Sequence, residues 1–208
     1  MGLRKATEPQ GLRRIEPRDY ARDSDGLIEQ LKDPDPSIRR WAARDLSAQP
    51  QACAALCQHL LHEKDGSVRE VVFTTLGCIG GTPVVDGVLP LLRSEDANLR
   101  NSAIELLAGL PDAVGPRIDT LLADPDPDVR IFTVNLLGDL KHPNLVRWLA
   151  QVLHDDAHVN VVAAALEVIA EVGATDALPA VQLARQRFTG DPFIEFAADL
   201  AVQRIEAA

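Results

Sequence analysis

The chain has 208 residues, of which 46% are hydrophobic, 25% charged and 4% aromatic. This composition excludes a disordered chain, a collagen and a disulfide-built miniprotein, and it predicts a globular fold that buries roughly 70% of its unfolded surface. No apolar run approaches the roughly 20 residues that span a bilayer, and the first residues lack the apolar core of a secretory signal. We therefore expect a cytoplasmic protein without a membrane contact, whose three cysteines are reduced.

The formal net charge of −10 is unevenly distributed along the chain. Residues 1–22 carry six basic and three acidic side chains, which leaves a net charge of −13 for residues 23–208. We therefore expect a basic N-terminal tail at 1–22 and a folded repeat domain at 23–208. Nucleic acid is not an expected partner, because its affinity depends largely on Lys and Arg side chains that neutralise phosphates.

An internal repeat runs through the folded domain. Six segments, from DPSIRRWAARDL to DPFIEFAADLAV, align without gaps on an apolar anchor residue, and successive anchors are 30, 31, 30, 30 and 35 residues apart. The anchors are Ile38, Val68, Leu99, Val129, Val159 and Ile194. An aspartate lies three residues before each anchor, at Asp35, Asp65, Asp96, Asp126, Asp156 and Asp191. Because Asp is a favoured N-cap, each repeat is predicted to begin a helix there.

Each repeat contains two segments that are predicted to form helices. Apolar residues recur at helical spacing after each anchor, and a second apolar-periodic segment of roughly 11 residues lies before the next aspartate. A two-helix unit of this size cannot bury its apolar face alone, so the copies must stack on one another. The sequence therefore predicts an all-α, right-handed α-solenoid of about six two-helix repeats.

The order of Asp, two residues, an aliphatic anchor, Arg, and then small and leucine positions resembles HEAT repeats. It is most similar to the short HEAT-like repeats grouped with phycobilin lyase subunits, over roughly residues 25–206. The resemblance implies the solenoid fold and a polar ladder between repeats, formed by Asp35, Arg39, Asp65, Arg69, Asp96, Arg100, Asp126 and Arg130. It does not imply one activity, because the fold hosts scaffolds, lyases, a hydroxylase and glycosylases.

The resemblance also implies that the second helix of each repeat lines a concave surface. On that surface the residues change from polar to apolar toward the C-terminus, which favours binding of an amphipathic helix or peptide from a protein partner. The expected partner-binding residues are Arg40, Glu70, Phe73, Asn101, Ile104, Ile131, Val134 and Val161. The alternative is that the inner helices of a tightly curved array bury one another.

The cysteines are the candidate metal ligands. Cys53 and Cys57 are four residues apart on one predicted helix face, and Cys78 lies near the end of the next helix. Their spacing matches no metal signature, so we interpret them as core thiols and predict no metal or other cofactor. A metal or cluster site at these cysteines is the alternative.

Glu167 is an anomaly in the fifth repeat. It stands eight residues after the anchor, where the earlier repeats have Leu46, Leu76, Leu107 and Leu137. A carboxylate near the core is one interpretation. We favour a rotation of the helix that turns Ile169 and Ala170 inward.

The sequence contains no glycine-rich phosphate loop, nucleophile elbow or paired metal motif. It has one His-Glu pair, His62-Glu63, whereas the similar deoxyhypusine hydroxylases carry several. The main hypothesis is therefore a non-enzymatic scaffold or adaptor, either a monomer or a weak homo-oligomer. The alternative is an accessory protein that assembles or attaches a cofactor, either a metal cluster or a tetrapyrrole, and a lyase-like activity stays open.

Overall fold

The structure is a computed structural model, and it describes residues 21–172 and 175–207. Within these ranges every regular element is helical. The α-helices are α1 (Ser24–Gln30), α2 (Pro36–Asp45), α3 (Cys53–Leu60), α4 (Gly66–Ile79), α5 (Gly81–Val88), α6 (Ala97–Ala108), α7 (Pro111–Leu122), α8 (Pro127–Asp139), α9 (Leu145–Asp155), α10 (Val159–Val172), α11 (Leu178–Arg187) and α12 (Pro192–Ala207). Short 3₁₀ turns lie at Leu46–Ala48, Pro50–Ala52, Leu89–Arg93 and Thr175–Ala177. None of these helices is long and apolar enough to cross a membrane.

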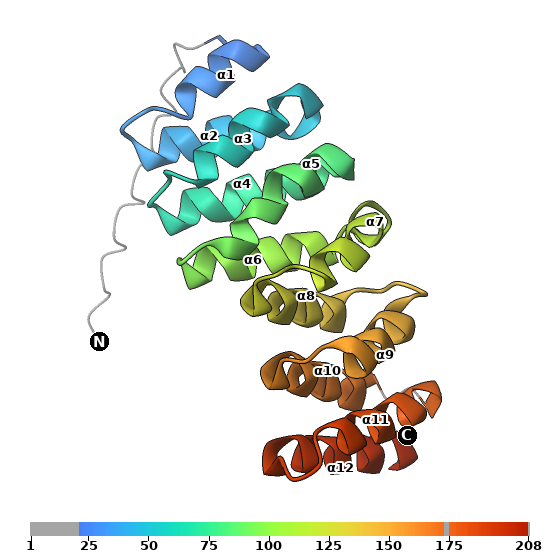
Figure 1. Ribbon diagram of the computed structural model, residues 1–208. Coiled ribbons are helices and arrows are strands. Elements are labelled where there is room, and N and C mark those ends of the chain that lie inside the picture. The colour runs from blue at the N-terminus through green and yellow to red at the C-terminus, as the bar shows by residue number, and fades with distance from the viewer. Residues whose placement is uncertain (1–20, 173–174, 208) are drawn as a thin grey trace, which may run out of the picture.

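The helices form two layers (Figure 1). The even-numbered helices pack on one another in chain order from α2 to α12, and the odd-numbered helices do so from α3 to α11. Each odd helix and the even helix that follows it make one repeat, so the described residues contain six two-helix repeats. The predicted all-α solenoid is confirmed.

The repeat aspartates explain why the even helices begin where they do. Each accepts a hydrogen bond from the backbone amide two residues later, at distances between 2.8 and 3.0 Å. In five repeats this amide belongs to the first helical turn, and such a cap stabilises a helix by roughly 0.5–2 kcal/mol. Helix α10 differs from the prediction, because it begins at Val159, after the His158 amide that Asp156 binds. Proline follows the aspartate at positions 36, 127 and 192, where its fixed φ angle suits the first helical residue.

The core is a continuous column of aliphatic side chains along the array. Four of the six anchors are buried, whereas Ile38 and Val159 are half-buried. The leucines eight residues after the first four anchors are all fully buried: Leu46, Leu76, Leu107 and Leu137. The core therefore repeats with the same period as the sequence over the first four repeats.

Helix α10 departs from that register. Glu167 is exposed, whereas Ile169 and Ala170 are buried, so the predicted rotation of this helix is confirmed. Val168 faces α8, because a Cβ atom added to Gly138 would lie 3.5 Å from one of its methyl groups. The fifth repeat therefore presents a different side of its even helix to its neighbours.

Two glycines turn the chain between α4 and α5. Gly80 has φ 64° and ψ −171°, and Gly81 has φ 79°. L-amino acids with a side chain rarely adopt this backbone conformation, because Cβ collides with the neighbouring peptide groups. The reversal of the chain at this repeat therefore depends on glycine.

We predict that Gly80→Ala lowers the free energy of unfolding by about 1–3 kcal/mol, since it forces a side chain into a glycine-only conformation. Gly66→Ala is the matched control, because Gly66 has ordinary helical geometry and no atom would lie within 4 Å of its new Cβ. Urea unfolding followed by circular dichroism measures both. An equal effect of the two substitutions would contradict the role assigned to Gly80.

Candidate functional site

Two clefts open on the even-numbered layer, one on each side of α6. The α4–α6 cleft has a volume of about 670 Å³, and the α6–α8 cleft has a volume of about 810 Å³. Glu105 and Gly109 line both of them. These volumes lie in the range of small-molecule sites, roughly 300–1,000 Å³.

The α4–α6 cleft combines an apolar floor with a polar rim. Its apolar lining includes Phe73, Leu106 and Leu110, and its polar lining includes Lys64, Glu70, Thr74, Ser102 and Glu105. Gly77 lets α6 approach α4 closely, since a Cβ atom at this position would lie 3.3 Å from a methyl group of Leu106. The cleft can therefore hold a flat apolar group and still offer charges at its mouth.

Four of the predicted partner-binding residues lie at these clefts. Glu70 and Phe73 line the α4–α6 cleft, and Asn101 and Ile104 line the α6–α8 cleft. Glu70 and Asn101 are exposed, whereas Phe73 and Ile104 are only 8% and 9% exposed. The apolar members of this set contribute to the walls of the clefts rather than to an open surface.

The other four predicted residues do not form the expected apolar wall. Val134 and Val161 are fully buried, so the expectation that they contact a partner is wrong. Val134 lies in the packed core of the even layer, and the rotation of α10 takes Val161 into that core. Ile131 is half-buried, and Arg40 donates a hydrogen bond of 2.7 Å to the Ser67 hydroxyl of the next repeat.

The predicted ladder forms direct ion pairs at two steps. Arg69 donates to Asp96 at 2.6 Å, and Arg130 binds both carboxylate oxygens of Asp156 at 2.7 and 3.1 Å. The hydrogen bond from Arg69 lowers the pKa of Asp96 below its ordinary value. These pairs link consecutive repeats across half-buried surfaces.

The expected pairing with an aspartate is wrong at the other two steps. Arg100 donates to the Ser94 carbonyl and lies over the Phe132 ring, 4.4 Å from its centre, and Asp126 is bound by Arg93 instead. Arg39 binds Glu63, which lies two residues before the expected Asp65. Asp35, Asp65 and Asp126 thus serve mainly as the N-caps described above.

Glu63 is a structural centre that the repeat pattern did not reveal. Both of its oxygens accept from Arg39, at 2.7 and 2.8 Å, and it also binds His59 and the amides of Lys64 and Asp65. Burial raises its pKa, but the hydrogen bond from Arg39 and the neighbouring donors outweigh burial and lower the pKa to about 2. This carboxylate therefore joins the first two repeats as a buried anion. The His59 and Glu63 spacing of four residues was the available sequence signal.

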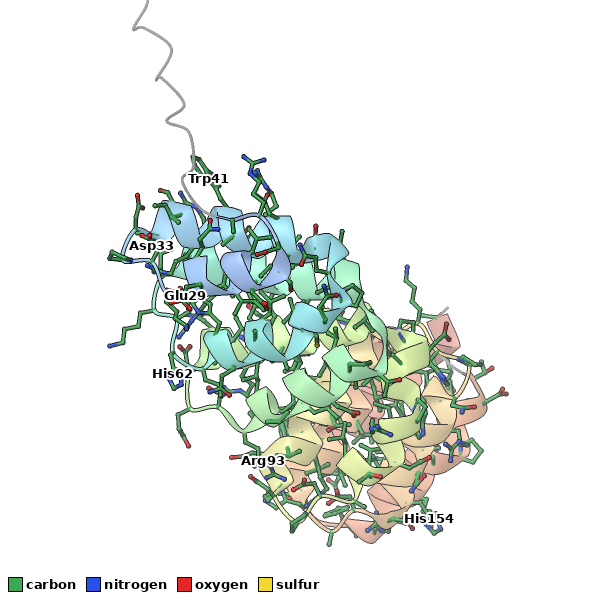
Figure 2. All side chains as sticks on the ribbon, turned by 90° about the horizontal axis from the view of Figure 1, so that it is seen from above. Glu29, Asp33, Trp41, His62, Arg93 and His154 are labelled. Carbon is green, nitrogen blue, oxygen red and sulfur yellow. The ribbon has the colours of Figure 1, made fainter. Side chains whose placement is uncertain are left out.

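The cysteines do not come together as a ligand set. Cys53 and Cys57 are buried, and Cys78 is exposed. Burial, together with Cys53 alongside, raises the pKa of Cys57 to about 12, so this thiol is protonated at neutral pH and is a poor metal ligand. His62 points outward at the periphery of the molecule (Figure 2). Among residues 21–172 and 175–207, no three His, Cys, Asp or Glu side chains are placed to hold a metal ion.

The fold and the inter-repeat clefts define an α-solenoid repeat protein. The family model for HEAT repeats matches residues 24–108 and 115–188, and the chain belongs to this family. The resemblance that the sequence suggested is thus confirmed.

Two relatives are named for phycocyanin and for bilin biosynthesis. The uncharacterized phycocyanin operon protein Z of Pseudanabaena tenuis is 27% identical over 86% of this chain and 94% of its own length. The bilin biosynthesis protein PecE of Mastigocladus laminosus is 31% identical over 71% of this chain, and the match spans 56% of PecE.

Solved structures with similar folds are more distant. Human deoxyhypusine hydroxylase is 18% identical, with a TM-score of 0.48 over 90% of this chain and 76% of the hydroxylase chain. The complex of CpcE and CpcF of phycocyanin lyase from Nostoc contains a chain that is 17% identical. That match has a TM-score of 0.37 over 98% of this chain and 100% of the other.

We predict that Glu63→Gln lowers the free energy of unfolding by roughly 3 kcal/mol at pH 7, because it leaves the Arg39 guanidinium without its buried anion. The folded-state pKa of Glu63 lies below its ordinary value of 4.5. The stability that Glu63 supplies is therefore present above about pH 4.5 and is lost as the pH falls toward 2. The difference between wild type and variant should shrink over that window.

Urea unfolding at several pH values measures this difference. Glu29→Gln is the matched control, since Glu29 pairs with Lys32 on the surface and its side chain is 71% exposed. We expect the control to change stability by less than about 0.5 kcal/mol. A Glu63→Gln difference that stays constant from pH 7 to the lowest pH would contradict the assigned role.

Proposed function

We propose that this protein is an accessory factor in tetrapyrrole attachment and that its α4–α6 cleft holds an open-chain tetrapyrrole. The observation that carries the proposal is the 31% identity to PecE, a protein named for bilin biosynthesis, over 71% of this chain. The match to phycocyanin operon protein Z over nearly its full length supports the same pigment context. This proposal corresponds to the alternative hypothesis from the sequence rather than to the adaptor hypothesis.

The chemistry of the α4–α6 cleft fits such a ligand. An open-chain tetrapyrrole has a flat conjugated body and two propionate side chains. Phe73, Leu106 and Leu110 offer an apolar surface to the rings, and Lys64 offers a cation to a propionate at the mouth. Arg69 also lines the cleft, but its ion pair with Asp96 holds it in place.

The role we assign to the cleft is to hold the tetrapyrrole and present it to the protein that receives it. A lyase-like attachment step would be the enzymatic form of that role. Presentation also requires a surface that contacts the acceptor. Phe193 and Phe196 on α12 support this second requirement, because their side chains are 51% and 67% exposed.

We predict that the purified protein binds biliverdin with a shift in its visible absorbance and that Thr74→Trp weakens this binding about tenfold or more. Thr74 is exposed at the rim of the α4–α6 cleft, so an indole there fills space that the ligand needs. Thr120→Trp on α7 is the matched control, because Thr120 is also an exposed helical threonine and lies outside both clefts.

Absorbance titration measures both variants, and circular dichroism checks that they fold. Equal affinities for wild type, Thr74→Trp and Thr120→Trp would exclude this cleft as the binding site. Absence of any absorbance change with wild type would exclude the tetrapyrrole itself.

A further inference from the structure

The exposed charge of the four central even helices is entirely acidic. Helices α4, α6, α8 and α10 carry six exposed carboxylates: Glu70, Glu105, Asp128, Asp139, Glu167 and Glu171. No ion pair within the described residues involves any of them. We call the exposed side of α4 through α12 the even-helix face.

The arginines of these helices do not balance that charge. Each of α4, α6 and α8 contains one basic residue, and α10 contains none. Arg69 and Arg130 bind Asp96 and Asp156, and Arg100 lies over the Phe132 ring. All three are half-buried. The exposed Lys64 and Lys141 line the two clefts between these helices, but the six carboxylates outnumber them, so the even-helix face keeps a net negative charge between α4 and α10.

The odd-numbered layer differs from this face. Arg117 on α7 pairs with Asp86 on α5, and Arg147 on α9 pairs with Asp119 on α7, each across a repeat boundary. Across α5, α7, α9 and α11 four arginines balance four aspartates, so these helices carry no net charge. An acidic composition alone would not leave these odd-numbered helices balanced in charge and α4, α6, α8 and α10 without exposed basic residues.

The even-helix face ends at an exposed apolar patch. Phe193 and Phe196 are three residues apart on α12, and the half-buried Leu200 follows one turn later. Relative to the anchor Ile194 these three residues hold the register positions that Asp128, Glu70 and Glu105 hold relative to their own anchors, so the patch lies on the same side of the array as those carboxylates. Two large exposed aromatic residues side by side are typical of a contact surface.

The spacing of these features sets the length of a ligand. Packed helices lie about 8–10 Å apart, so α4 to α8 spans roughly 20 Å, and α8 to α12 spans the same again. An extended polypeptide advances about 3.3 Å per residue, so each distance corresponds to about six residues. The two clefts beside α6 provide depressions along the first half of this path.

We propose that the even-helix face binds an extended segment of a partner protein, with cations over the carboxylates of α4 to α8 and apolar side chains against Phe193 and Phe196. The cationic half of the segment covers the two clefts, and the apolar half ends on α12. The proposal needs no tetrapyrrole, so its test is carried out without one. Its failure and that of the tetrapyrrole proposal are therefore distinguishable.

Fluorescence anisotropy with the full chain tests this assignment. The probe is a labelled synthetic peptide of about 12 residues, with three lysines in one half and two leucines in the other, made in both orders. The test variant is Glu70→Gln with Glu105→Gln and Asp139→Asn. We expect it to weaken binding about tenfold at low salt, since three exposed ion pairs are lost.

The control variant removes the same charge elsewhere. Asp25→Asn with Asp112→Asn and Asp176→Asn neutralises three exposed carboxylates that lie outside the even-helix face. We expect less than a twofold change in affinity for this control. Equal weakening by the two triple variants would show that the peptide responds only to the net charge of the protein, and this result would overturn the proposal. Absence of binding by wild type would also overturn it.

The apolar half of the assignment has its own test. A second peptide carries serine in place of both leucines. Wild type should bind the leucine peptide more tightly than this serine peptide, and the ratio of the two affinities should fall to about one in the variant with both Phe193→Ser and Phe196→Ser. An unchanged ratio in the folded variant would remove α12 from the site.

A competition experiment tests which protein supplies the bound segment. If a peptide of residues 1–22 displaces the probe where an equally basic scrambled peptide does not, the occupant is the chain's own N-terminus, and the assignment to a partner protein is wrong.

Discussion

Every repeat of this protein depends on the burial of its even helix against the next even helix. A single two-helix unit leaves one apolar side uncovered, so it has no stable structure without its neighbour. The aspartate caps fix where the even helices of the first four repeats begin, and this start places the leucine of each of these repeats into the shared core. The clefts and charges of the surface follow from the same arrangement, because they occupy the positions that stacking leaves open.

The same constraint explains why one layer is acidic and the other is balanced. The residue after each anchor lies near the start of its helix, where Arg69 and Arg130 reach the next repeat. Arginines at these positions strengthen the contact between repeats but are not available to the open face. In the odd layer, Arg117 and Arg147 lie on the surface and compensate aspartates there.

The sequence was sufficient for the features that repeat. Spacing between anchors and the aspartate before each one predicted six helix pairs and the starts of five even helices, all but α10, because these depend on local hydrogen bonds and periodicity. It was insufficient where a contact depends on the angle of a whole helix, as with Val134 and Val161. Glu63 was missed for a related reason, since it lies outside the aligned segments, between α3 and α4, and pairs with Arg39 of the preceding repeat.

The rotation of α10 has a consequence for how the array could be rebuilt. The sides of α8 and α12 that meet α10 are fitted to a helix that is turned relative to the other even helices, with Val168 against Gly138. The six repeats are therefore not interchangeable modules. Excising the fifth repeat would bring together two helix sides that were never complementary, whereas the first four share one register. Any length variation within this architecture is most readily accommodated before α8.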